Sequence, residues 1–240
     1  MAPTLVASRT ALPPEGAVPP KGGLSAEPAP TLVASRTALT PEGAVLPKGG
    51  LSAERVLPPL KPALSFAPEL LLRAQGVKVV FFDVDGVLTD GGLYLSEAGE
   101  TLKRFNILDG LGLKLLQKVG ITPAVITGRD SPALRVRLQA LGIAHVHFGT
   151  EDKRPAAEIT LRTLGLDWSA AAAMGDDWPD LPVLRRAALS CAPANAHAEV
   201  RALAHYVTRA RGGHGAVREL CDLLLVASGR YASLLQDYSQ

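Results

Sequence analysis

Residues 79–92 read VVFFDVDGVLTDGG. In this stretch a run of apolar residues ends abruptly at Asp83 and Asp85, and Gly86 follows directly. Two carboxylates this close together repel each other and lose solvation at the end of a buried strand, unless a cation lies between them. The stretch therefore predicts a buried strand whose carboxyl end holds a cation.

The rest of the chain alternates between strand-like and helix-like segments. We expect strands over residues 78–84, 121–126, 144–148 and 170–174, short strands over 188–191 and 205–208, and a hairpin over 93–105. We expect helices over residues 108–118, 132–141, 154–164 and 216–227, and one that starts at residue 179 or 180. This alternation predicts an α/β fold with a doubly wound, mostly parallel sheet, which binds ligands at the carboxyl ends of its strands.

Polar residues follow several of these strands. Thr127 and Gly128 leave one strand, Asp176 leaves another, and Lys153 precedes a helix. The carboxyl ends of parallel strands share one edge of the sheet, so these groups should meet Asp83 there. Mg²⁺ prefers carboxylate, carbonyl and phosphate oxygens. We expect it on Asp83, Asp176 and a main-chain carbonyl near Asp85, with Lys153 and Thr127 facing a phosphate.

The segments DVDGVLTD, ITGRD, the lysine of GTEDK and GDDWPD occur in the order of four known motifs. Together they resemble the haloacid dehalogenase-like phosphatases. FNILDGLGLK and RGGHGAVRELCDLLL resemble a capless subfamily that acts on sugar acid phosphates such as 3-deoxy-D-manno-octulosonate 8-phosphate. The resemblance covers about residues 70–228. It implies a Rossmann-like domain with a small β-hairpin flap and no cap, Mg²⁺ as cofactor, a homotetramer, and a role in lipopolysaccharide precursor synthesis.

The resemblance also assigns roles to the motif residues. Asp83 is the nucleophile that forms an aspartyl-phosphate, and Asp85 is the general acid and base. Thr127 and Lys153 hold the phosphate, and the metal ligands are Asp83, Asp85 and Asp176. Asp177 and Asp180 hold the metal ligands in place without binding the metal themselves, although Asp180 could simply start a helix. The expected substrate contacts are Asp85, Asn106, Asp109, Gly110, Lys114, Gly128, Arg129, Arg137 and Lys153.

Some residues keep a second interpretation. Lys114 and Arg137 could be solvated helix charges, and His145 and His147 suggest a zinc pair but lack a third ligand, which favours a structural role. His214 stands where the subfamily has arginine. We expect the glycine-rich stretch around His214 to close the open site of a neighbouring subunit, although its glycines could simply start the helix that follows, with His214 exposed.

Three other functions are compatible with parts of the pattern. Another sugar acid phosphate, such as a nonulosonate 9-phosphate, would need the same catalytic residues. A response-regulator receiver also groups Asp, Thr and Lys, but there the acid pair precedes the phosphorylated aspartate by a whole strand–helix unit. A non-catalytic accessory subunit is the third alternative.

The first 65 residues differ in composition from the rest of the chain. Residues 2–27 recur almost unchanged as residues 29–54, and residues 1–65 hold twelve of the nineteen prolines and no aromatic residue. Such a segment buries too little apolar surface to offset its ordering entropy. We expect disorder over 1–65, a phosphatase domain over 66–230 and a flexible tail over 231–240.

The composition of the chain limits which binding partners and which cellular compartment we expect. The formal net charge is +2, which indicates no nucleic-acid surface. No apolar run approaches the ~20 residues of a membrane helix. Two cysteines, Cys191 and Cys221, favour a reduced compartment over a disulfide framework. We therefore expect a cytoplasmic protein whose partner is a small molecule, with neither nucleic acid nor a membrane.

Overall fold

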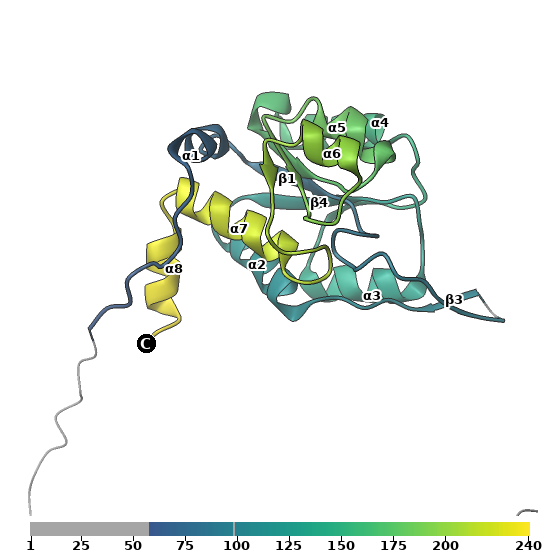
Figure 1. The fold of residues 1–240 in the computed structure, drawn as a ribbon, viewed down its shortest axis with the longest axis horizontal. Coiled ribbons are helices and arrows are strands. Elements are labelled where there is room, and N and C mark those ends of the chain that lie inside the picture. Colours follow the sequence, from purple (N-terminus) through teal and green to yellow (C-terminus); the bar gives the residue numbers. More distant parts are fainter. Residues whose placement is uncertain (1–57, 98) are drawn as a thin grey trace, which may run out of the picture. The chain divides into compact units, whose positions relative to one another are not determined.

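The computed structural model describes residues 58–97 and 99–240 (Figure 1). The tandem repeat expected to be disordered lies outside the described residues. Residues 58–67 form neither helix nor strand, and the first helix, α1, spans Pro68–Ala74.

Six parallel strands form the central sheet, in the spatial order β5-β4-β1-β6-β7-β8. Their bounds are β1 Val79–Phe82, β4 Thr122–Ile126, β5 His145–His147, β6 Ala171–Met174, β7 Leu189–Ala192 and β8 Tyr206–Val207. The first strand lies in the middle because the chain adds β4 and β5 on one side of it and β6 to β8 on the other. This arrangement confirms the predicted doubly wound α/β fold, and the reversal of strand order at β1 marks where such sheets bind ligands.

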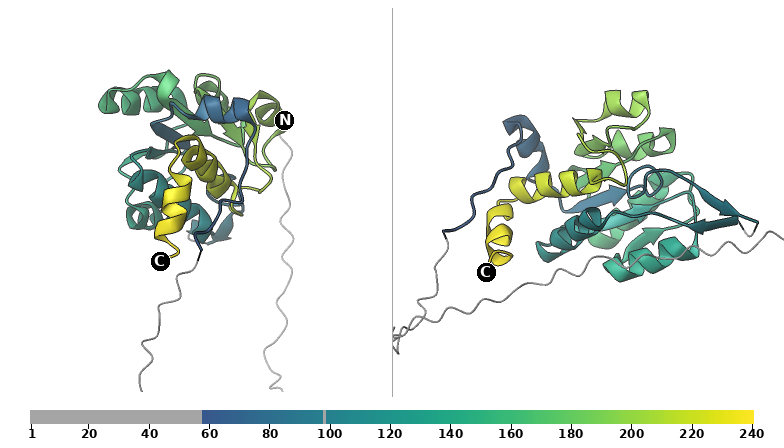
Figure 2. Two further views of the ribbon diagram at one scale, coloured as in Figure 1. Left: turned by 90° about the vertical axis from the view of Figure 1, so that its left-hand side faces the viewer. Right: turned by 60° about the horizontal axis from the view of Figure 1, so that its bottom comes forward.

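Helices cover both faces of this sheet (Figures 1 and 2). One layer holds α2 Ile107–Lys118, α3 Pro132–Leu141 and α7 Ala216–Ala227, and the other holds α4 Lys153–Leu164, α5 Leu181–Leu184 and α6 Ala198–Leu203. Successive residues of a strand point to opposite faces. Val80 and Phe82 of β1 accordingly belong to the first core, and Val79 and Phe81 to the second. A strand buried on both faces explains the unbroken apolar run before Asp83.

A two-stranded hairpin, β2 Tyr94–Ser96 and β3 Gly99–Leu102, is inserted between β1 and α2. It extends away from the sheet (Figure 1). Its strands lie within the predicted range of residues 93–105 and end at Leu102, and Tyr94, Leu95 and Leu102 are exposed. The hairpin therefore contributes little to the core of its own subunit.

The structure forms a helix where the sequence analysis expected a flexible tail. Helix α8 spans Tyr231–Asp237, and Leu234 is buried against the core that includes α7. Lys118 Nζ lies 3.2 Å from Asp237 Oδ2, which links the end of α8 to α2. The apolar spacing of Tyr231 and Leu234, three residues apart, accounts for this docking. No helix in the described part of the chain is long and apolar enough to cross a membrane.

Helix α2 packs closely on α7 at Gly112. A Cβ at Gly112 would lie 3.1 Å from Arg218 Cδ and from Cys221 Cβ. We expect Gly112→Val to lower the free energy of unfolding by about 1–3 kcal/mol, because the larger side chain forces the two helices apart. Urea denaturation measures this change. Gly76→Val is the control, since the nearest atom to a Cβ there is 3.9 Å away. Equal effects of the two substitutions would contradict the close packing at Gly112.

Candidate active site

The predicted catalytic residues gather where β1, β4 and β6 end. Asp83 directly follows β1, Thr127 directly follows β4, and Asp176 lies two residues beyond β6. Lys153 is the first residue of α4. Four segments that are distant in sequence thus meet at the carboxyl edge of the sheet, as the strand pattern predicted.

Lys153 connects Asp83, the candidate nucleophile, to the loop that carries Asp176 and Asp180. The Lys153 ammonium donates to Asp83 Oδ1 and to Asp180 Oδ1, each over 2.6 Å, and its side chain is only 7% exposed. The other oxygen of Asp180 accepts the backbone N–H groups of Asp176, at 2.9 Å, and Asp177, at 3.3 Å. Asp180 therefore holds both Lys153 and the loop that carries Asp176. It also completes a capping box with Asp177, so both interpretations of Asp180 describe the observed contacts.

Three carboxylates at this edge form a group suited to a divalent cation. Asp83, Asp176 and Asp180 each offer an oxygen, and these oxygens lie within 4.8 Å of one another. A Cβ at Gly86 would overlap the Asp176 carboxylate, so only glycine allows this approach. Hard oxygen donors with an excess of negative charge fit Mg²⁺. The spacing groups the side chain of Asp180, rather than that of Asp85, with Asp83 and Asp176.

The charge excess shifts the acidity of two of these groups. Burial and the nearby Asp180 carboxylate raise the pKa of Asp83 to about 6, although Lys153 opposes the rise. Burial, together with the carboxylates of Asp83, Asp180 and Asp177, raises the pKa of Asp176 to about 8. One ammonium does not balance three carboxylates, and a bound cation would remove the imbalance.

The side chain of Asp85 points to the hairpin. Lys103, just after β3, donates to Asp85 Oδ1, and Arg129 Nε lies 3.8 Å from Asp85 Oδ2. Both cations also pair with Glu100, Lys103 at 2.7 Å and Arg129 at 3.8 Å. Lys103 and Glu100 were not expected at the site, because charged side chains on a short flap are usually solvated. Their spacing of three residues was the only signal, and it is a weak one.

Thr127 is buried at this edge, and Gly128 and Arg129, which follow it, are exposed. Thr127 is 1% exposed, and its hydroxyl oxygen accepts the N–H of Arg129 at 3.2 Å, which leaves its own proton free to donate. A Cβ at Gly128 would meet no atom within 4 Å. The Arg129 side chain is 50% exposed at the rim. Gly128 and Arg129 are therefore open to a ligand, whereas Thr127 is covered.

Asp109 lies elsewhere than the sequence analysis expected. It is 1% exposed, and its carboxylate accepts the N–H groups of Arg218, at 2.7 Å, and Gly215, at 3.2 Å. Asp109 thus satisfies free donors at the start of α7 and is not available to substrate. The Asp109 side chain points from α2 toward α7, and it therefore caps α7 instead of contacting a substrate.

The other expected substrate contacts cluster at the start of α2. Asn106 caps this helix by accepting the N–H of Leu108 at 2.8 Å, and its carbonyl accepts Arg137 Nη2 at 3.3 Å. A Cβ at Gly110 would overlap the Arg137 guanidinium, so this glycine makes room for the arginine. Lys114 is exposed on the same helix. The structure does not join these residues to the acidic group around Asp83.

The glycine-rich stretch packs against the loop of its own chain that follows β1. A Cβ at Gly212 would overlap the carbonyl oxygen of Gly86, and Gly213 donates its N–H to Val87 at 2.9 Å. We expected this stretch to close a neighbouring subunit's site. Within the chain, the glycines support the loop beside Asp85, because only glycine permits such close backbone contact. The role at a neighbouring subunit stays a prediction.

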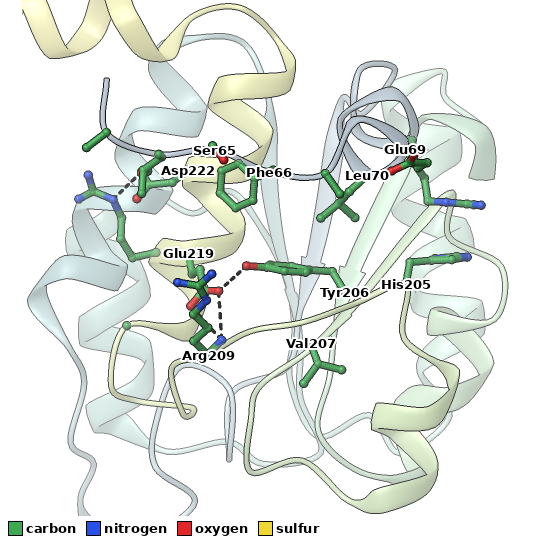
Figure 3. A pocket seen from close by; sticks show the side chains of 16 residues that line it. Ser65, Phe66, Glu69, Leu70, His205, Tyr206, Val207, Arg209, Glu219 and Asp222 are labelled. Carbon is green, nitrogen blue, oxygen red and sulfur yellow. Dashed lines mark hydrogen bonds and ion pairs between the residues drawn. The ribbon is translucent and has the colours of Figure 1, made fainter. Parts of the chain in front are cut away.

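A pocket of about 930 Å³ lies apart from this edge, between the segment at residues 63–73, β8 and α7 (Figure 3). Its lining contains none of the predicted catalytic residues. Two of its acidic groups are already engaged: the Tyr206 hydroxyl donates to Glu219, and Arg218 Nε lies 2.8 Å from Asp222. The predicted catalytic residues lie instead at the acidic edge around Asp83.

Comparisons with known proteins agree with this geometry. A profile of haloacid dehalogenase-like hydrolases matches residues 142–220. The chain is 43% identical to the 3-deoxy-D-manno-octulosonate 8-phosphate phosphatase KdsC of Yersinia pestis over 164 residues, which are 68% of this chain and 88% of the relative.

Solved structures show the same similarity. A probable YrbI-family phosphatase from Pseudomonas syringae aligns with TM-score 0.71 and 45% identity over 72% of this chain and 99% of that one. The 3-deoxy-D-manno-octulosonate 8-phosphate phosphatase of Moraxella catarrhalis, solved with magnesium, phosphate and the sugar acid, aligns with TM-score 0.69 and 38% identity over 71% and 98% of the two chains.

The raised pKa values of Asp83 and Asp176 predict a pH-dependent stabilisation by Mg²⁺. The folded, metal-free protein keeps protons that the unfolded chain releases between about pH 4 and 8, so its free energy of unfolding falls as the pH rises through this range. Mg²⁺ requires the deprotonated carboxylates. We expect the increase in melting temperature on adding Mg²⁺ to grow from about pH 5 to about pH 8.

Thermal unfolding with and without Mg²⁺ at several pH values measures this increase. Asp176→Asn is the matched variant, and it should lose most of the pH-dependent part. An increase in melting temperature that is the same at every pH would contradict the prediction.

Proposed function

Because this chain belongs to the haloacid dehalogenase-like phosphatases, in the group with the 3-deoxy-D-manno-octulosonate 8-phosphate phosphatases, we propose that it carries out the hydrolysis of this phosphate ester with the groups around Asp83. The products are the free sugar acid and phosphate, in lipopolysaccharide precursor synthesis. The observation that carries the proposal is the buried acidic group with Lys153, at the carboxyl edge of a sheet in a chain 43% identical to such a phosphatase.

Asp83 is the proposed nucleophile. Lys153 occupies Asp83 Oδ1, which leaves the other carboxylate oxygen free to attack the phosphorus in line. The attack forms an aspartyl-phosphate and breaks the bond to the sugar oxygen. The Lys153 ammonium and the Thr127 hydroxyl can both donate to phosphate oxygens, and this stabilises the charge that develops there.

Mg²⁺ is the cofactor of this reaction, and the residues that would hold it are Asp83, Asp176 and the carbonyl near Asp85. When bound, it cancels the repulsion between the phosphate dianion and the attacking carboxylate. Asp180 keeps the loop that carries Asp176 in place through its bonds to the backbone.

Asp85 is the proposed proton carrier. It gives a proton to the departing sugar oxygen, and its carboxylate then takes a proton from the water that attacks the phosphorus of the aspartyl-phosphate. This second step releases phosphate and restores Asp83. A carboxylate that lies beside the nucleophile, rather than in the metal group, suits both transfers.

Cationic side chains are the proposed contacts of the sugar acid carboxylate. Arg129 lies at the rim and is half exposed. Arg137 Nε is buried without a hydrogen-bond partner in the described structure, which supports a role in binding an anion. Lys114 is exposed and could reach a large substrate. An arginine fork binds a carboxylate with two parallel hydrogen bonds.

Assembly and location are further parts of the proposal. The hairpin and the start of α2 expose Leu95, Leu102 and Ile107, which supports burial between subunits of a homotetramer. Cys191 and Cys221 are free and buried, which supports a location in the reducing cytoplasm.

Asp83→Asn should abolish turnover, because an amide cannot form the aspartyl-phosphate. We expect activity to fall by at least about three orders of magnitude, measured as phosphate release from a panel of sugar acid phosphates that includes 3-deoxy-D-manno-octulosonate 8-phosphate and a nonulosonate 9-phosphate. Asp237→Asn, which changes an exposed aspartate of α8, is the control and should leave turnover unchanged. Residual activity of a few per cent in Asp83→Asn would refute the covalent mechanism.

Leu95→Glu should dissociate the tetramer, since it introduces a charge on the apolar hairpin surface. Light scattering after size-exclusion chromatography measures the mass. Leu72→Glu is a matched control, because Leu72 on α1 is exposed to the same extent, 68%. A wild-type protein that is monomeric, or an unchanged mass in Leu95→Glu, would count against assembly through the hairpin.

A further inference from the structure

Four charged groups meet where the hairpin returns to the domain. Glu100 of β3 and Lys103 just after it face Asp85 and Arg129. Each cation contacts both carboxylates, so the charges alternate around a ring of Asp85, Lys103, Glu100 and Arg129. Two acids and two bases balance one another, in contrast to the acidic group around Asp83.

The two cations of this ring differ in exposure. The Lys103 side chain is 1% exposed, whereas that of Arg129 is 50% exposed. A bulky substrate can therefore reach Arg129, while Lys103 is enclosed by the groups it contacts. Enclosure of a cation between two carboxylates suits a structural link to Asp85 better than a contact with substrate.

The ring also gives Asp85 a defined orientation. Asp83, Asp176 and Asp180 already concentrate negative charge at the strand ends, and a fourth carboxylate turned toward them would be repelled. Lys103 and Arg129 instead hold the two oxygens of Asp85 on the hairpin side. In this orientation Asp85 stays out of the metal group and faces the hairpin.

We propose that Lys103, held by Glu100, is a positioning residue that orients the Asp85 side chain for proton transfer, so that the hairpin controls the acid and base of the reaction. The inference rests on the proposed function for the role of Asp85. It assigns Glu100 and Lys103 a part in the chemistry although neither touches the phosphate.

The test compares two kinds of leaving group. An alkyl ester such as the sugar acid phosphate needs a proton on its departing oxygen, whereas p-nitrophenyl phosphate releases a stable anion without one. In Lys103→Met we expect kcat for the alkyl ester to fall about 10- to 100-fold with KM within about twofold, since a positioned acid contributes at least this much. The initial burst of nitrophenolate should keep its rate within about threefold. Lys118→Met, on the exposed surface of α2, is the control.

A double-mutant cycle separates positioning from a direct role. Because Lys103 acts through Asp85, Lys103→Met should cause no further loss in the Asp85→Asn background. Lys103→Arg, which keeps the charge, should recover part of the activity. Glu100→Gln should show the same pattern to a smaller degree, and it provides a second variant if Lys103→Met unfolds.

Several results would overturn the proposal. A higher KM with unchanged kcat would make Lys103 a substrate contact, and an additive loss in Asp85→Asn would make its effect independent of Asp85. A crystal structure of Lys103→Met with an unmoved Asp85 side chain would also reject it. That structure tests the inference even if the wild-type protein hydrolyses none of the phosphate esters, an outcome that would refute the proposed function instead.

Discussion

The interaction on which the rest of the site depends is the bond between Lys153 and Asp83 at the end of β1. Three carboxylates gather within 4.8 Å of one another, and in the described structure Lys153 is the cation that pairs with two of them. One ammonium leaves net negative charge in a poorly solvated place, which the raised pKa values of Asp83 and Asp176 reflect. The fold thus leaves an excess of negative charge that a divalent cation would neutralise.

Glycines allow the loops around this group of carboxylates to approach one another closely. Gly86 leaves room for the Asp176 carboxylate, and Gly212 lets a distant loop contact the backbone of Gly86. Gly175 has the same function beside Asp180. A side chain at any of these positions would separate loops that carry catalytic groups. The rigid sheet fixes where the strands end, and the glycines then determine how near the loops come.

The features that the sequence predicted correctly are those that depend on residue type and on the spacing of apolar residues. The apolar run before Asp83, the strand–helix alternation and the positions of Lys153 and Asp176 all follow from residue type and order. Contacts between distant segments could not be predicted this way. Asp109 caps α7, more than a hundred residues away, and nothing in FNILDGLGLK distinguishes a capping carboxylate from one that binds substrate. Tail helix α8 was missed for the same reason, because its few apolar residues have a partner only once α2 and α7 are packed.

The hairpin shows how one short element can serve two purposes. Leu95 and Glu100 are cross-strand partners, so the exposed apolar position and the partly buried charge belong to the same pair of strands. A two-stranded hairpin is marginally stable alone, since it has no core of its own. Lys103, which also pairs with Glu100, connects the hairpin to Asp85, while the apolar residues of the hairpin lack cover within the described part of the chain. Any contact that orders the outer part must therefore also restrict Glu100, and through Lys103 the orientation of Asp85.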